Sequence, residues 1–338
     1  MDEAFRRRAV LGGMAGGMAA LVAPLAAPRG ARAQGAAPVL DQVARTIVGF
    51  PAGGSSDTVA RLYAERLRGA YAPQVIVENR PGAGGRVGIE AVKAARPDGA
   101  TLLQTPASML TIYPHIYPRS VRYDALADFI PVTPVCSFPF GFAVRADHPA
   151  RSLAEFAAWA RAQGNAVPFA SPAAGSMPHF LGVQMAKALG LSLTHVPYRG
   201  SAPAMQDLIG GQIPAVMLVL GDITEYQRTG HVRILGISAP QRLPRLPELP
   251  TFAEQGYPAL TAEEWFGVLL PARTPAPVVA GLHRALLAAA AQPELQQALA
   301  RLEYSTAPRE PAAFAAQIAE ERQRWGGIIA DSGFQPED

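Results

Sequence analysis

The sequence has almost no cysteine for disulfide bonds and few long apolar runs that could span a membrane. A single cysteine, Cys136, occurs among 338 residues, so no disulfide can form within the chain and stability must come from the core. Cys136 lies in an apolar stretch without a neighbouring histidine, which predicts a buried structural thiol rather than a nucleophile. Beyond the first 33 residues, no apolar run is long enough to span a bilayer. These absences indicate a globular protein, and 49% hydrophobic residues suit one.

The N-terminus resembles an export signal. Three arginines at positions 6–8 precede a run of small and apolar residues that ends in the A-x-A site of residues 31–33. This pattern predicts that residues 1–33 are a cleaved signal of the twin-arginine or the general secretory type, and that the protein is periplasmic. The alternative is an uncleaved membrane anchor. The segment holds five arginines and two acids, so its net charge of +3 equals that of the whole chain. The mature chain is then nearly neutral, so nucleic acid is not an expected partner.

The common motifs of nucleotide binding and catalysis are also missing. The turn after residue 49 has the glycine spacing of a phosphate loop, but Ser55 stands where the lysine is required. The glycines of residues 82–88 miss the dinucleotide spacing by one position, which favours a structural turn that packs a helix on its strand. No G-x-S-x-G occurs, the six histidines are scattered, and the adjacent Glu263 and Glu264 would face opposite sides of a strand. We therefore expect no cofactor, no metal and no enzymatic activity.

Residues 45–138 alternate between strand and helix patterns. Short apolar runs predict strands at residues 45–50, 74–79 and 101–105, and amphipathic segments predict helices at 56–71, with Ser55 or Ser56 as N-cap, and at 89–95. This order is typical of a parallel sheet flanked by helices, with ligands at the carboxyl ends of the strands.

A second α/β unit follows a long predicted strand at residues 131–149. Its strands are expected at 167–171, 193–198, 213–218 and 232–238, and a return strand at 263–275 precedes two C-terminal helices. One long strand enters this unit and another leaves it, which predicts two lobes joined by two crossover strands with a cleft between them. We place lobe 1 at residues 39–143 plus 262–338 and lobe 2 at residues 144–261.

Two loops of similar character open helices in the two predicted units. FPAGGSSD, residues 50–57, and SPAAGSMPH, residues 171–179, both offer small residues, hydroxyls and free backbone N–H groups at a helix start. Either loop alone could be an ordinary N-cap. Two such loops at equivalent places favour a clamp that holds an anion from both sides.

Several longer motifs resemble one protein family. They include FPAGGSSDTVAR, VIVENRPGAGGRVGIEAV, YDALADFIPVTPV, SPAAGSMPHFLG, HVPYRGSAPAMQDLIGGQI, LPTFAEQGYP and EEWFGVLLPARTPAPVV. In this order they resemble the extracytoplasmic solute-binding proteins of tripartite tricarboxylate transporters, the Bug-type receptors. The resemblance implies a two-lobed, type II-like periplasmic binding protein that closes on a small carboxylated solute and presents it to membrane transporter subunits. It further implies that backbone groups and ordered waters of the two loops hold the carboxylate.

The resemblance also implies a set of ligand-binding residues. The sequence departs from the family pattern at two places: residue 173 is alanine where the family often has glycine, and LVLGDITEY replaces a more common segment that contains asparagine. The implied residues are Pro51, Ala52, Gly53, Gly54, Ser55, Asp57, Ser171, Gly175, Ser176, His179, Pro197 and Tyr198. Asp222, which is expected near the cleft, is added to this set.

Three of these residues have alternative roles. Asp57 would repel a carboxylate, so it is expected to cap its helix or to meet a ligand amine or a water. His179 is expected to cap or pack rather than touch the ligand. Asp222 either favours an amino or amide substituent or caps its helix. Two alternative functions stay open: an exported hydrolase that uses Ser176 and His179, and a solute sensor for a membrane signalling protein.

Overall fold

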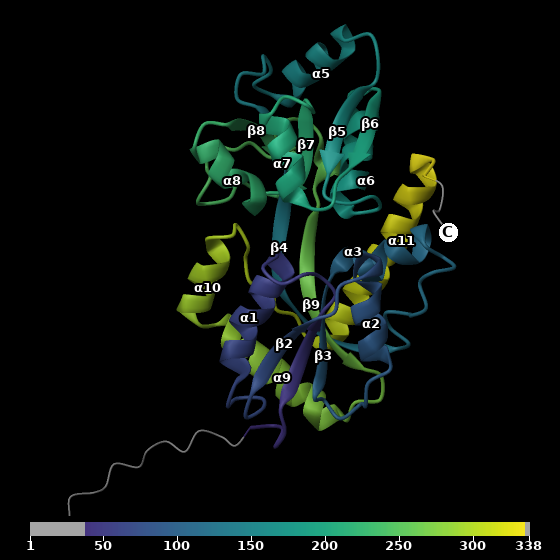
Figure 1. The fold of residues 1–338 in the computed structure, drawn as a ribbon, viewed down its shortest axis with the longest axis vertical. Helices are drawn as coiled ribbons and strands as arrows, with labels where there is room; N and C mark the ends of the chain where they lie inside the picture. The colour runs from purple at the N-terminus through teal and green to yellow at the C-terminus, as the bar shows by residue number, and fades with distance from the viewer. Residues whose placement is uncertain (1–37, 335–338) are drawn as a thin grey trace, which may run out of the picture. The chain divides into compact units, whose positions relative to one another are not determined.

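The computed structural model, which describes residues 38–334, joins nine strands through one shared strand, β4 (Figure 1). The predicted export signal lies outside the described residues. The strands are β1 (Ala44–Val48), β2 (Val75–Asn79), β3 (Thr101–Pro106), β4 (Phe129–Arg145), β5 (Val167–Ser171), β6 (Leu193–Pro197), β7 (Ala215–Val219), β8 (Val232–Ile237) and β9 (Glu263–Pro271).

Helices connect these strands and flank them on both sides in Figure 1. They are α1 (Ser55–Leu67), α2 (Arg86–Lys93), α3 (Ala107–Thr111), α4 (Tyr113–Ile116), α5 (Leu153–Ala162), α6 (Met177–Leu189), α7 (Ser201–Ile209), α8 (Gly221–Arg228), α9 (Ala276–Ala290), α10 (Pro293–Ala300) and α11 (Pro311–Ser332). Three of these helices, α3, α4 and α10, are not predicted by the sequence pattern. The helix predicted at residues 56–71 begins one residue later than α1, whose N-cap is Gly54.

The first sheet has the order β2-β1-β3-β9-β4, with β1 parallel to both β2 and β3. β9 runs antiparallel between β3 and β4. The second sheet consists of β4, β7, β5 and β6, with β8 also paired to β4; β5 is parallel to β6 and β7. The expectation of two α/β units is therefore confirmed, but each sheet is mixed rather than mainly parallel, because β4 and β9 pair antiparallel with their neighbours.

Strand β4 passes from one sheet into the other. Residues up to Pro139 pair with β9, and residues from Phe140 onward pair with β7 and β8. The register with β9 shifts beside Pro131 and Pro134, where proline cannot supply a ladder N–H group. The return strand β9 leads back from the second unit and pairs only within the first sheet, so β4 is the one strand that both sheets share among the described residues.

The glycines before and within α2 allow this helix to pack closely against the end of β1. A Cβ on Gly88 would lie 2.9 Å from Cα of Gly49, and one on Gly49 would lie 2.6 Å from the carbonyl oxygen of Gly85. Only glycine permits this approach of α2 to the end of β1. The expectation of a structural turn is confirmed.

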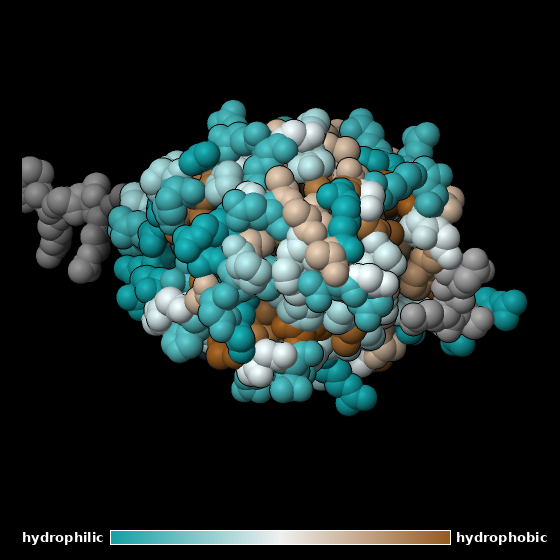
Figure 2. Space-filling view, turned by 90° about the horizontal axis from the view of Figure 1, so that it is seen from above, coloured by the Kyte–Doolittle hydropathy of each residue, from teal (hydrophilic) through white to brown (hydrophobic). Residues whose placement is uncertain are grey.

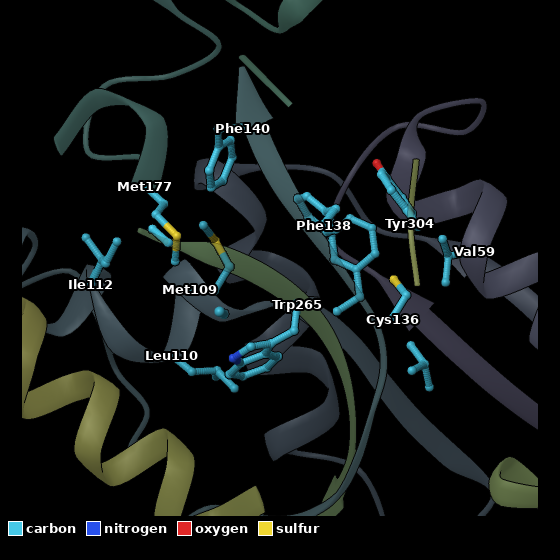
Figure 3. Close-up of a cluster of buried hydrophobic side chains, with 14 of the residues drawn as sticks. Val59, Met109, Leu110, Ile112, Cys136, Phe138, Phe140, Met177, Trp265 and Tyr304 are labelled. Atoms are coloured by element: carbon cyan, nitrogen blue, oxygen red, sulfur yellow. The ribbon is translucent and has the colours of Figure 1, made fainter. Parts of the chain in front are cut away.

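Buried aromatic and aliphatic side chains fill the region around β4 and β9 (Figure 3). Cys136 lies among them without exposure, and its burial raises the pKa of the thiol, as expected for a structural cysteine. Phe138, also in this cluster, stacks on Tyr304 with ring centroids 4.6 Å apart. The cluster includes residues of both sheets, such as Trp265 of the first sheet and Phe169 of the second.

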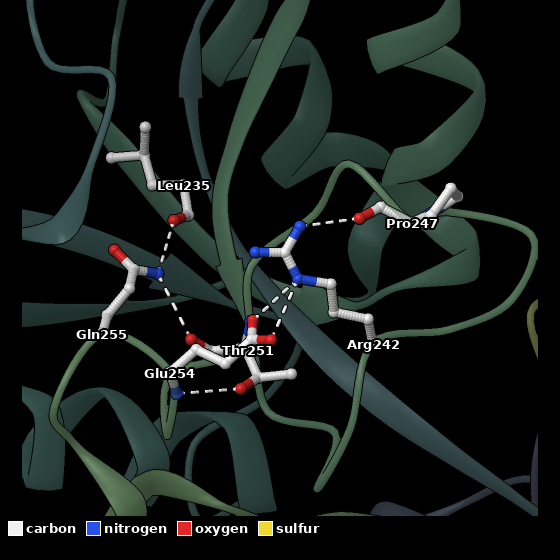
Figure 4. Close-up of polar contacts among 6 residues, drawn as sticks. All are labelled: Leu235, Arg242, Pro247, Thr251, Glu254 and Gln255. Atoms are coloured by element: carbon white, nitrogen blue, oxygen red, sulfur yellow. Dashed lines mark hydrogen bonds and ion pairs between the residues drawn. The ribbon is translucent and has the colours of Figure 1, made fainter.

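The proline-rich segment after β8 is fixed by polar contacts rather than by secondary structure (Figure 4). Arg242 donates from Nε to both carboxylate oxygens of Glu254, at 3.0 and 2.9 Å, and from a terminal nitrogen to the carbonyl of Pro247. Gln255 donates to the carbonyl of Leu235 on β8 at 2.9 Å. These contacts hold the loop beside the second sheet.

The surface carries few large apolar side chains. In Figure 2, seen from the end that carries α5, hydrophilic residues cover most of the face and apolar atoms show only between them. Of the helices described, none combines the length and apolar character that crossing a membrane requires.

Candidate functional site

A cavity of about 680 Å³ lies at the carboxyl ends of parallel strands from both sheets. Its lining segments directly follow β1, β3, β5, β6 and β7, which is where ligands bind in α/β sheets. Residues of β4, β9 and the segment after α10 complete it. The lining residues include Pro51, Gly53, Gly54, Ser55, Ser56, Ser108, Phe138, Ala173, Ser176, Arg199, Gly200, Ser201, Asp222, Glu264, Phe266 and Tyr304.

The loop after β1 is held in place from behind by Asp57. Its carboxylate accepts the backbone N–H of Gly53 at 2.9 Å, Nε of Arg61 at 2.8 Å and the amide of Asn79 at 3.0 Å. These donors, with the Arg61 hydrogen bond the strongest, keep the pKa of Asp57 below its usual value despite burial. Asp57 thus fixes the start of α1, consistent with the expected capping role, and it does not line the cavity.

The fixed loop presents polar groups to the cavity. Gly53 adopts a φ of +84°, and Gly54 is the N-cap of α1. The hydroxyl of Ser56 is buried without a hydrogen-bond partner among the described residues, although Ser56 lines the cavity. A buried hydroxyl without a partner is costly, so a ligand acceptor here would satisfy it.

The loop after β5 is also pre-ordered. The hydroxyl of Ser176 donates to the carbonyl of Ala173 at 2.7 Å, and Gly175 donates its N–H to Nδ1 of His179 at 3.1 Å. Ser171 lies 2.7 Å from Nε2 of His195, whose ring stacks on His179 at 3.6 Å. Burial lowers the pKa of His179 to about 4, and burial with the neighbouring His179 lowers that of His195 to about 3. Both imidazoles are therefore neutral at pH 7 and serve the packing of the loop.

A third helix start, not among the expected loops, also lines the cavity. Gly200 is the N-cap of α7, and Ser201 is its first residue, directly after β6. The signal was in the sequence, since a small residue and a hydroxyl again follow a parallel strand. Arg199 beside them is exposed and is the one arginine or lysine among the lining residues.

Two carboxyl groups line the cavity, the buried Glu264 on β9 and the half-buried Asp222 on α8. Glu264 on β9 is 6% exposed; the N–H of Ser108 donates to its Oε1 at 3.0 Å, and the Ser108 hydroxyl makes a short bond to the same oxygen. Burial raises the pKa of Glu264 to about 7. Asp222 in the first turn of α8 accepts the hydroxyl of Ser201 at 2.5 Å, and burial raises its pKa. Asp222 is not the N-cap of α8, which is Leu220, so the capping alternative is wrong.

The structure brings together about half of the residues expected at the site. Those that line the cavity are Pro51, Gly53, Gly54, Ser55, Ser176 and Asp222. Those that lie outside the lining are Ala52, Asp57, Ser171, Gly175, His179, Pro197 and Tyr198. Tyr198, for example, donates from its hydroxyl to Asp207 at 2.6 Å.

The hydrolase alternative finds no support in the arrangement of Ser176 and His179. The Ser176 hydroxyl donates to a backbone carbonyl, and the His179 Nδ1 accepts a backbone N–H. A nucleophilic serine needs a base within hydrogen-bond reach, and these two side chains do not form that pair.

Comparisons with known proteins agree on one family. A family model described as "Tripartite tricarboxylate transporter family receptor" matches residues 59–334. The solved periplasmic binding protein BugD is 31% identical, with a TM-score of 0.75 over 86% of this chain and 98% of its own. A protein of R. palustris solved with adipate is 27% identical, with a TM-score of 0.80 over 87% and 98%. MatC from Rhodopseudomonas palustris with bound malate is 29% identical, with a TM-score of 0.74 over 85% and 98%.

Proposed function

Because this chain belongs to the tripartite tricarboxylate transporter receptor family, we propose that it captures a small carboxylate-bearing solute and delivers it to the subunits of a membrane transporter. Relatives of the same two-lobed α/β fold have been solved with adipate and with malate. The cavity of about 680 Å³ has room for solutes of this size.

The observation that carries this proposal is the convergence of three helix starts on one cavity. Gly54 and Ser55 of α1, Ser176 of α6, and Gly200 and Ser201 of α7 all line it. Unpaired backbone N–H groups and the positive end of the helix dipole favour an anion at each of them. Since α1 belongs to the first sheet and α6 and α7 to the second, one carboxylate-bearing solute would bridge both.

The strand pairing supports a division of the chain into two lobes. We assign residues 39–143 with 262–338 to lobe 1 and residues 144–261 to lobe 2. The change of partner on β4 between Pro139 and Phe140 lies close to the first of these limits and supports the assignment. Binding to both lobes would favour a closed arrangement of the cavity.

We propose binding and release rather than chemical conversion. The family is one of solute receptors, and the serine and histidine of the hydrolase alternative are engaged with backbone groups. The export signal expected over residues 1–33 would place the protein in the periplasm, where BugD also functions as a binding protein. Membership in the receptor family supports delivery to transporter subunits over delivery to a signalling protein.

Isothermal titration calorimetry tests carboxylate binding directly. The protein is unfolded, freed of co-purified solute, refolded and titrated with succinate, malate, adipate, citrate and benzoate. At least one of these acids is expected to bind with a Kd in the micromolar range or below, as about −8 kcal/mol of binding free energy implies.

A pair of glycine variants tests the role of the first loop. Gly53 and Gly230 both have positive φ, +84° and +76°, and in both cases an added Cβ would meet no atom within 4 Å. Gly53→Ala and Gly230→Ala therefore impose similar backbone strain, but only Gly53 lines the cavity. We expect Gly53→Ala to weaken acid binding about tenfold and Gly230→Ala to leave it unchanged. Equal affinities in the two variants, or no binding of any acid by the refolded protein, would contradict the proposal.

A further inference from the structure

The two oxygens of the Glu264 carboxyl group have different surroundings. Oε1 accepts the N–H of Ser108 at 3.0 Å and also the Ser108 hydroxyl, so both of its lone pairs are engaged. Oε2 has no hydrogen-bond partner among residues 38–334, yet it is not one of the fully buried polar atoms that lack a partner. Because the residue is only 6% exposed and lines the cavity, Oε2 is the oxygen that a molecule in the cavity can reach.

No positive charge accompanies this carboxyl group. Within the described part of the chain, no arginine, lysine or histidine forms an ion pair with Glu264, and the one basic residue of the cavity lining, Arg199, is exposed. A buried carboxylate without a cation is disfavoured relative to the neutral acid. Burial therefore raises the pKa of Glu264 to about 7, although Ser108 donates two hydrogen bonds to it. Since Oε1 is already an acceptor twice over, the proton of the neutral acid lies on Oε2.

The titratable groups around Glu264 also favour its neutral form. The carboxyl group of Glu321 on α11 raises the pKa of Glu264 further. Tyr304, from the segment after α10, and Cys136 on β4 both have pKa values that burial raises, so both are uncharged at pH 7. Asp222 on α8, which lines the same cavity, is a second acid whose pKa burial raises. None of these four groups supplies a positive charge.

We propose that Glu264 binds the solute in its protonated form, so that Oε2 donates a hydrogen bond to a solute carboxylate and capture of the solute takes up one proton. This inference rests on the proposed function, because it needs a negatively charged solute in the cavity. An ionised Glu264 would repel that charge, whereas the neutral acid donates to it in a charge-assisted hydrogen bond. The proton comes from the solvent and returns to it when the solute leaves, so acidic surroundings favour capture and alkaline surroundings favour release.

Calorimetry of the wild type at two pH values measures this proton. The refolded protein, freed of solute, is titrated with malate, adipate and benzoate, whose carboxyl groups are largely ionised above about pH 6. Each titration is run at pH 6 and pH 8 in two buffers that differ in protonation enthalpy. At pH 8 the binding enthalpy should differ between the buffers by the amount for about one proton taken up, and at pH 6 it should hardly differ. The affinity should fall about tenfold from pH 6 to pH 8, because Glu264 must regain its proton.

Two substitutions then separate the proton of Glu264 from the size of its side chain. In Glu264→Gln an amide N–H replaces the proton on Oε2, and the amide oxygen still accepts from Ser108. This variant should bind without proton uptake and, at pH 8, about tenfold more tightly than wild type. Glu264→Met has a similar length but no donor, so it should bind about tenfold more weakly than wild type at pH 6.

Glu320→Gln is the matched control for the loss of one acid. Glu320 on α11 is exposed and does not line the cavity, so this variant should keep the affinity and the proton uptake of wild type. Asp222→Asn provides a second comparison, because Asp222 is the other acid of the cavity lining.

The outcomes distinguish this inference from the proposed function. Absence of binding by every acid would overturn both. Binding by wild type without proton uptake, or weaker binding by Glu264→Gln than by wild type at pH 8, would overturn the inference and leave carboxylate binding intact. Proton uptake that persists in Glu264→Gln would also overturn it, and its loss in Asp222→Asn would then assign the proton to Asp222. If Glu264→Met does not fold, wild type and Glu264→Gln still decide.

Discussion

At the residue scale, Glu264 shows how environment decides the role of a side chain. The sequence predicted that Glu263 and Glu264 would face opposite sides of a strand, and only Glu264 lines the cavity. No sequence pattern could have identified it, because its role depends on Ser108 from α3 and on burial under residues distant in sequence. Asp57 could be placed at the start of α1, but its bond to Asn79 on β2 could not.

The raised pKa of Glu264 predicts a pH dependence of stability. Its pKa in the folded protein is about 7, above the ordinary value of 4.5, so the folded state retains the proton that the unfolded state loses. Its contribution to stability is therefore full below about pH 4.5 and decreases toward pH 7, by at most about 1.4 kcal/mol per pH unit. Glu264→Gln removes this dependence, so the variant should gain stability relative to wild type between about pH 5 and pH 7.

Urea unfolding of wild type and Glu264→Gln at several pH values measures this difference. Burial raises the pKa of Glu264 most, the hydroxyl and N–H of Ser108 lower it, and the carboxyl of Glu321 on α11 raises it further. Tyr304 also lies within electrostatic range of Glu264. Glu320→Gln provides the control, because Glu320 on α11 is exposed. A stability difference that does not change with pH would show that Glu264 is ionised throughout.

At the element scale, the strand-to-helix loops were the most predictable part of the site. Glycine and serine after a short apolar run indicate a helix start, and the parallel sheet brings these starts to one edge. The same rule applied to β3 and β6 would have indicated Ser108 and Ser201. The short helices α3 and α4 were missed because TPASMLTIYPHIYP carries no clear period and contains several prolines.

The loop after β5 contacts α4 of the first sheet, and this contact yields a prediction. A Cβ at Gly175, whose φ is +69°, would lie 2.1 Å from Cδ1 of the fully buried Ile116. Gly175→Ala should therefore weaken solute binding about tenfold and destabilise the protein by about 1–3 kcal/mol, because loop and α4 must separate.

Ile116→Val removes only the clashing methyl group and tests this explanation. Alone it should cost about 0.5–1.5 kcal/mol, whereas in the double variant it should restore most of the affinity lost through Gly175→Ala. Calorimetry and urea unfolding of the four proteins form a double-mutant cycle. Strictly additive effects would mean that backbone strain at Gly175, and not contact with Ile116, causes the loss.

At the scale of the whole molecule, the sequence predicted two α/β units and a cleft, since strand and helix periods alternate in both. It could not predict that β4 alone would serve both sheets, because the change of partner at Pro139 and Phe140 depends on the tertiary positions of β7 and β9. Tyr304 was beyond prediction for the same reason: it reaches the cavity from a segment with no regular structure.

The shared strand and the continuous core predict that the two sheets unfold together. One buried cluster includes Phe142 and Phe169 of the second sheet with Phe138 and Trp265 of the first, and α11 packs on β4, α3 and α6. Thermal unfolding should therefore show one transition, and a bound solute should shift all of it. At a ligand concentration about 100 times Kd, the gain is about 2.7 kcal/mol. Calorimetric scans with and without solute measure this shift; two transitions, of which the solute moves only one, would show that the sheets unfold independently despite sharing β4.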